Sequence, residues 1–465
     1  QGALPGRGSS ARMRSLAARP GVAGRSHAAA SRSRPLEGEQ VTMGFRRQSF
    51  VWSAAHIPGT VVRAWEGQTD AADKLFRSGM RVEEFEEAVA SDGLASLPSW
   101  VDFELLGEGC SFFIQMWPFI LTNFFWAMLG GFGSESASAV LLQSRYWAGK
   151  GDMGREDTWQ RLRETACWLF DVAAHGEGGF TPGGPAWKAC LHVRYLHCRT
   201  RASIWASGAW GSEQTERYGQ PINQGQLVGT LLGSSALLLQ GMEEMAKASL
   251  PQRSKEAFIH LWRVVGFLFG IDEDLNPNTS YKDAIIAMES VFHHGVPAFP
   301  EKTLTGSLTQ HICESVAHGV RQESSLPIDA GAIAVPAWYF LGREYGAAIG
   351  LPKPTWAAWL VGLGRMYALK SFLLLFQAPG VPQVLESFML RLFASLVHGI
   401  RQKQPRCRFG AQAVRCVDRA LATKSAQCPL GFGRSNSSAQ VDACLCIPKS
   451  EDFASLTAKV MPTIL

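Results

Sequence analysis

The feature that most constrains this chain is a turn followed by a long stretch without helix breakers. Residues 182–185 read Pro-Gly-Gly-Pro, and residues 186–207 contain neither Pro nor Gly, so a helix of several turns is predicted there. On that helix Arg194 and Arg201 lie about one turn before and one turn after His197. A histidine between two arginines suits a bound polyanion that also carries a metal, while a hydrogen-bonded core histidine is the plainer interpretation.

Three further motifs accompany this one. The turn and helix read Gly-Gly-x-x-Trp-Lys and then Val-Arg-x-x-His-x-x-x-Arg. Arg-x-x-x-Thr stands upstream at 161–165, and Gly-x-Pro-Ile-Asn-Gln (219–224) and His-x-Trp-Arg-x-x-Gly (260–266) stand downstream. Each motif is weak alone, but the ordered set within residues 105–277 resembles the latex clearing protein (rubber oxygenase) and mpaB-type oxygenase family.

The resemblance implies an all-α fold with a multi-helix, globin-like core around a b-type haem, extra helices and disordered termini. It implies O2 as co-substrate, and an oxidoreductase that cleaves or oxygenates a C=C bond of a hydrophobic, isoprenoid- or lipid-like substrate. A non-catalytic, membrane-associated protein that binds haem or lipid is the alternative. By the resemblance the iron ligand is His197, the other cofactor-binding residues are Arg194 and Arg201, and Arg161, Glu164 and Thr165 are catalytic residues on the oxygen side of the haem.

Glu164 departs from the family pattern, in which a Lys stands just before the Thr. A carboxylate in an apolar, haem-lined pocket resists ionisation, so its pKa is expected to rise towards a value useful for proton transfer. We therefore predict that Glu164 is a general acid or base. The alternative is a charged pair with Arg161, one turn back on the same helix.

Composition narrows the function classes. Apolar residues make up 46% of the chain and charged residues 18%, and 15 Trp and 26 Phe suit either an aromatic core or a flat apolar ligand. The sequence has no basic stripe with interleaved aromatics, so nucleic acid is not an expected partner. It has no Gly-x-Ser-x-Gly or His-Glu-x-x-His motif, which gives a hydrolase little support, and no Cys-x-x-Cys-His for covalent haem attachment.

Several apolar stretches predict further helices. The charge-free run from Cys110 to Gly133 is long enough to span a bilayer, but Gln, Pro and Asn within it favour a buried core helix. Residues 355–377 and 384–401 predict two apolar helices, which either pack on the core or contact a membrane in its plane. Other helices are expected at 157–174, 226–247 and 256–270, and in residues 300–350, broken by Pro327 and Pro336.

The domain prediction has three parts. Residues 1–45 form an Arg- and Ser-rich extension that is either disordered or a transit peptide. Residues 68–402 form a single helical domain, and residues 403–465 form a Cys-containing tail that we expect to be poorly ordered. The location expected is intracellular, either membrane-associated or, with a transit peptide, organellar.

Overall fold

The computed structural model describes residues 79, 84–85, 96–144, 151–295, 302–324, 327–376, 378 and 380–403, together with two short strands. The strands β1 (Gln40–Val41) and β2 (Phe50–Val51) pair antiparallel, with Gln40 opposite Val51. All the other regular elements of the described residues are helices, which confirms the prediction of a mainly α fold. The described elements belong to one compact unit, residues 35–465. The predicted extension and tail lie outside the described residues, except for β1 and the end of the last helix.

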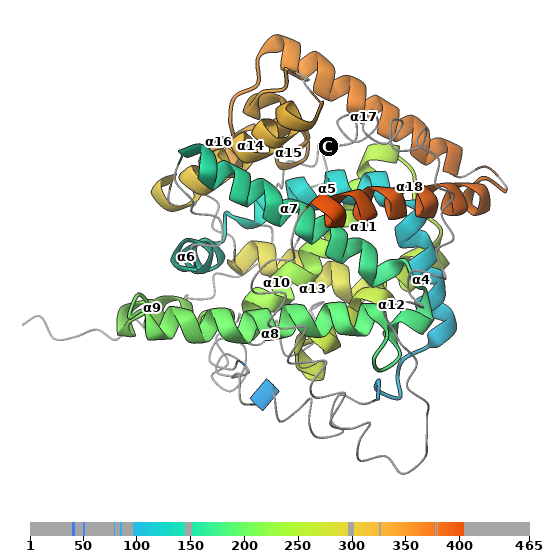
Figure 1. The fold of residues 1–465 in the computed structure, drawn as a ribbon, viewed down its shortest axis with the longest axis horizontal. Helices are drawn as coiled ribbons and strands as arrows, with labels where there is room; N and C mark the ends of the chain where they lie inside the picture. The colour runs from blue at the N-terminus through green and yellow to red at the C-terminus, as the bar shows by residue number, and fades with distance from the viewer. Residues whose placement is uncertain are drawn as a thin grey trace, which may run out of the picture. The chain divides into compact units, whose positions relative to one another are not determined.

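Figure 1 shows the order of the helices, whose bounds follow the chain. They are α4 (Phe103–Gln115), α5 (Trp117–Gly131), α6 (Glu135–Gln143), α7 (Gly151–Ala173), η3 (Glu177–Phe180), α8 (Pro185–Ala206), α9 (Ser212–Tyr218), α10 (Gln224–Ser234), α11 (Ala236–Ala246), α12 (Gln252–Phe269), η4 (Glu273–Leu275), α13 (Tyr281–Gly295), α14 (Lys302–Ser324), α15 (Ala330–Leu341), α16 (Arg343–Ala348), α17 (Trp356–Phe376) and α18 (Val381–Lys403).

The charge-free run forms two helices rather than one. The axes of α4 and α5 meet at 84° on either side of Met116, and Pro118 lies in the first turn of α5, where its missing N–H costs nothing. Most side chains of both helices are buried, so the prediction of a core segment is confirmed and the single helix is corrected. Helix α4 packs closely along α12, because a Cβ on Gly109 would lie 2.3 Å from the carbonyl oxygen of Ala257.

Two other helix predictions need correction. The stretch 226–247 is divided into α10 and α11 at Ser235, whose ψ of −87° and buried hydroxyl, bonded to the Leu231 carbonyl and the Asn278 side chain, break the helix. Pro336 does not end a helix but lies inside α15. The apolar helices expected at 355–377 and 384–401 are observed as α17 and α18.

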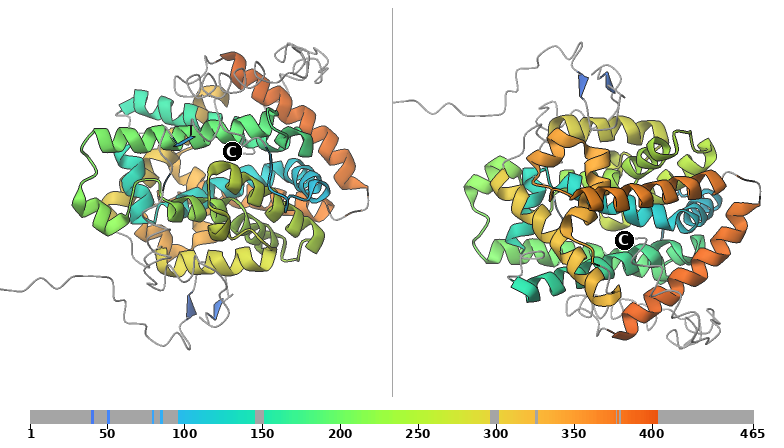
Figure 2. Two further views of the ribbon diagram at one scale, coloured as in Figure 1. Left: turned by 90° about the horizontal axis from the view of Figure 1, so that it is seen from below. Right: turned by 90° about the horizontal axis from the view of Figure 1, so that it is seen from above.

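Three helices position the candidate site. Helix α8 starts at Pro185, after a turn in which Gly183 has a φ of 85° and therefore favours glycine. It packs against α7 on one side and α12 on another, and α7 also packs on α14. The further views of Figure 2 confirm that α8 and α17 lie on opposite sides of this set of helices.

Candidate active site

His197 projects from α8 beside the end of α12. The edge of its ring meets Phe269 at a centroid distance of 5.8 Å and an interplanar angle of 88°. Its Nδ1 is buried and has no hydrogen-bond partner among the described residues. Burial, and secondarily the charge of Arg201, lowers the pKa of His197 to about 4. The imidazole is therefore neutral at physiological pH with a ring nitrogen to spare, which is the form of histidine that binds metals.

Aromatic rings from α7 and α12 continue from His197. Phe269 lies 5.5 Å from Trp168, and Trp168 lies 6.4 Å from Trp262, measured between ring centroids. The indole nitrogens of Trp168 and Trp262 are buried without a partner in the described part of the chain. His197 thus stands at the edge of an apolar, aromatic wall, the kind of surroundings that suit a flat cofactor.

Arg194, one turn before His197, is a buried cation. Its side chain is closely covered by the chain at Gly270, where an added Cβ would lie 2.8 Å from Arg194 Nε. Asp272 acts on it electrostatically, but no ion pair joins Arg194 to any described carboxylate, and burial lowers its pKa. A buried guanidinium is stable only with a compensating anion or acceptor, so Arg194 fits the carboxylate of a bound group.

Arg201, one turn after His197, is bonded to a loop of the protein itself. Its Nε donates to the carbonyl oxygen of Pro221 at 2.9 Å, and an Nη donates to that of Ile222. Ile222 has a φ of 56°, which is strained for a β-branched residue, and Asn223 next to it caps α10. The motif at 219–224 is therefore a structural loop held by Arg201. The prediction that Arg201 also contacts a cofactor stays a prediction.

The catalytic residues predicted on α7 fall on two neighbouring parts of that helix. At 100° per residue, Arg161 and Glu164 share the face of Trp168, which is turned towards α12 and His197, and Thr165 lies at its border. The Thr165 hydroxyl donates to the Arg161 carbonyl oxygen at 2.9 Å. Glu164 is half-buried and accepts from Gln160 Nε2 at 3.1 Å.

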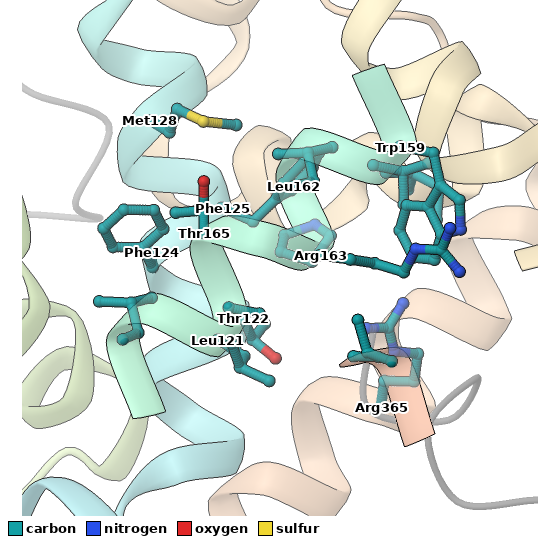
Figure 3. A pocket seen from close by; sticks show the side chains of 16 residues that line it. Leu121, Thr122, Phe124, Phe125, Met128, Trp159, Leu162, Arg163, Thr165 and Arg365 are labelled. Carbon is teal, nitrogen blue, oxygen red and sulfur yellow. The ribbon is translucent and has the colours of Figure 1, made fainter. Parts of the chain in front are cut away.

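A pocket lies on the other side of α7 (Figure 3). It holds about 770 Å³ of space, part of it open to solvent, and its lining is almost entirely apolar. Thr165 is one of the lining residues, whereas Arg161, Glu164 and His197 are not. The pocket is lined by Leu121, Thr122, Phe124, Phe125 and Met128 of α5, by Trp159, Leu162, Arg163, Thr165, Ala166 and Leu169 of α7, and by Val316, Ile333, Pro336, Arg365 and Ile400.

Two arginines of this pocket were not predicted from the sequence. Arg163 lies over Trp159, 5.6 Å from the ring centroid, and forms an ion pair with Glu323 of α14. Arg365 comes from α17, and burial lowers its pKa to about 10. No short motif marks either residue, since each acquires its place only when α7, α14 and α17 pack together.

His260, the first residue of the last motif, was also without an assigned role. Its Nε2 accepts a hydrogen bond from the backbone N–H of Asp102 at 3.0 Å, and Trp100 meets its ring edge-on. Arg263, one turn later, lies over the same Trp100 ring at 3.9 Å. The motif therefore anchors the start of α4 on α12, which is a structural role.

The described residues fit a haem rather than a metal ion held by side chains alone. They contain no cluster of three or more His, Cys, Asp and Glu side chains that could hold a metal ion. A haem iron needs only one or two protein ligands, because the macrocycle supplies four. His197 offers a neutral, unbonded nitrogen, the aromatic wall offers a flat apolar surface, and Arg194 offers a buried cation.

The all-α architecture and this site are those of an oxygenase catalytic domain. The chain belongs to the family described as "ER-bound oxygenase mpaB/B'/Rubber oxygenase, catalytic domain", which matches residues 113–372. A solved structure entitled "Structure of Latex Clearing Protein LCP in the closed state" is similar, with a TM-score of 0.47 and 19% identity, over 77% of this chain and 95% of that one. No curated protein matches the chain.

Proposed function

We propose that this protein is a haem-dependent oxygenase that cleaves or oxygenates a C=C bond of a hydrophobic, isoprenoid-like substrate. The observation that carries the proposal is His197, whose neutral imidazole presents a buried, unbonded nitrogen beside an aromatic wall in a chain of this oxygenase family. The rubber oxygenases of the family name point to polyisoprene-like chains as the substrate class.

The chain's own residues would hold the cofactor from two sides. His197 would supply the axial nitrogen, and the rings of Phe269 and Trp168 would cover an apolar surface of the macrocycle. Arg194 would pair with a propionate, because its buried charge has no ion-pair partner among the described residues. When bound, haem supplies the one-electron and O2 chemistry that side chains lack.

The residues of α7 would act on the oxygen side. The Thr165 hydroxyl proton is held by the Arg161 carbonyl, so the hydroxyl oxygen is oriented with its lone pairs free to accept a hydrogen bond. Glu164 and Arg161 lie on the face towards His197, where Glu164 would accept or donate the proton that the reaction moves. The apolar lining of the neighbouring pocket would exclude water and hold an extended hydrocarbon chain.

The axial ligand is tested by the absorption spectrum of purified His197→Ala beside wild type and His192→Ala. The two histidines are five positions apart on α8, about 140° around the helix, so they cannot share one ligand position. We expect a Soret band in wild type and in His192→Ala and its loss in His197→Ala. Equal haem content in all three proteins would refute the assignment, and a colourless wild type would refute haem dependence.

The reaction is tested by mass spectrometry of products from a panel of prenylated compounds and polyisoprene oligomers. Oxygenated or carbonyl-ended products are expected from the haem-loaded protein under O2. A haem-loaded protein without turnover of any unsaturated chain would instead support a non-catalytic haem- or lipid-binding protein.

The role of Glu164 is tested by Glu164→Gln, with Gln160→Ala as the matched control that removes only its hydrogen-bond partner. A general acid or base typically contributes two orders of magnitude or more to turnover, so a loss of about that size is expected, together with loss of the acidic limb of the pH–rate profile. Unchanged turnover across pH with haem intact would leave Glu164 a structural residue.

A further inference from the structure

Helix α17 presents an exposed face without a single charged side chain. We call this face the outer stripe; it recurs at spacings of three and four residues and so follows one side of the helix. Trp356 is 79% exposed, Tyr367 68%, and Leu360 and Leu375 are 61% and 62%. Ser371 is the one aliphatic hydroxyl, and it donates back to the Tyr367 carbonyl. The outer stripe consists of Trp356, Ala357, Leu360, Val361, Gly364, Tyr367, Ala368, Ser371, Leu374 and Leu375.

The opposite face of α17 is bound to the protein along its whole length. Ala358, Gly362, Met366, Leu373 and Phe376 are buried there, and α17 packs on α15 and α11. By length and composition α17 is the one unbroken helix of the described chain that could cross a membrane. A spanning helix would need lipid around it, whereas the buried side of α17 is already occupied, so its geometry fits contact in the plane of a surface. In the right-hand view of Figure 2 it crosses the near side of the helices.

The charges around the outer stripe have one sign. Residues 345–385 contain Lys353, Arg365 and Lys370 and no Asp or Glu. Lys353 is exposed just before the helix, and Lys370 is half-buried at its flank. A tryptophan and a tyrosine on an apolar face with lysines at its edge match the composition of helices that lie at the headgroup level of a membrane.

We propose that the outer stripe of α17, extended by the exposed Val384 and Phe388 of α18, docks in plane on a bilayer that contains anionic phospholipid. The exposed apolar side chains would enter the headgroup and upper acyl region, and the lysines would meet lipid phosphates. A second copy of this chain is a poorer partner, because an isologous contact would bring the same cations together.

The candidate pocket lies directly behind this surface. Arg365 of α17 and Ile400 of α18 are part of its lining, so the helices that would rest on the bilayer also form the pocket wall. A hydrocarbon dissolved in the bilayer would then reach the pocket without crossing water. This second part of the inference rests on the proposed function.

The surface is tested by flotation of the full-length protein with vesicles of phosphatidylcholine, with and without phosphatidylserine. The test variant is Leu360→Gln with Leu375→Gln, both at exposed positions where the fold does not depend on the leucine. The control is Trp205→Gln on α8, a side chain 42% exposed on another helix. We expect wild type and the control to float with anionic vesicles, and the double variant to partition about tenfold less or weaker still.

Equal flotation of wild type and the double variant, or equal loss in the control, would overturn the proposal. So would a dimer of wild type that the double variant dissolves while neither floats. The route to the pocket has its own readout: the double variant should oxidise vesicle-embedded substrate more slowly than wild type but a short soluble analogue equally fast. A protein that floats but oxidises neither substrate would refute the proposed function and leave the docking surface intact.

Discussion

Replacing Arg201 with methionine removes the donors that hold the loop at 219–224 while keeping an apolar stem of similar length. Two buried backbone carbonyls, of Pro221 and Ile222, then lose a charged donor. Hydrogen bonds to charged groups contribute about 1.5–3 kcal/mol each, and relief from burying the guanidinium offsets part of that sum. Since Ile222 also needs its neighbours to hold a φ of 56°, we expect a net loss of about 3 kcal/mol in the free energy of unfolding.

The assay is urea unfolding followed by far-ultraviolet circular dichroism, with Arg199→Met as the matched control on the same helix. Arg199 is exposed, so its substitution should change the free energy of unfolding by no more than about 0.5 kcal/mol. Arg201→Met with Ile222→Gly should recover part of the loss, because glycine adopts a positive φ without strain. If Arg201→Met and Arg199→Met unfold at the same urea concentration, the loop is not held by Arg201 and this reasoning is wrong.

Three other predictions concern packing, protonation and the oxygen side. Gly109→Ala should destabilise the protein by several kcal/mol, since its Cβ would meet the Ala257 carbonyl at 2.3 Å, whereas Gly131→Ala, with open space at that position, should be neutral or stabilise by about 0.5–1 kcal/mol in thermal or urea unfolding. Because the pKa of His197 is lowered to about 4, the haem-free protein should keep the full contribution of the neutral imidazole above pH 6.5 and lose up to about 3 kcal/mol as the pH falls towards 4; His197→Gln should flatten that slope in urea titrations, and an unchanged slope would contradict the burial of the ring. Thr165→Val should retain the Soret band of the loaded protein but lose most turnover, and full turnover would remove the hydroxyl from the chemistry.

The sequence by itself determined the helical class and the position of the central histidine. The break-free stretch after Pro185 fixes one long helix, because nothing in it interrupts backbone hydrogen bonding, and the spacing of Arg194, His197 and Arg201 then follows from helical geometry. The family motifs were also local and therefore readable in order along the chain.

Only the tertiary structure decided what those residues touch. Arg201 holds the loop at 219–224, and His260 holds the start of α4, because partners 20 and 158 positions away fold against them. The bend at Met116 and the break at Ser235 depend on packing and on a buried Asn278 rather than on helix propensity. The pocket collects side chains from α5, α7, α14, α15, α17 and α18, and no periodicity within one helix specifies which of its faces will meet five others.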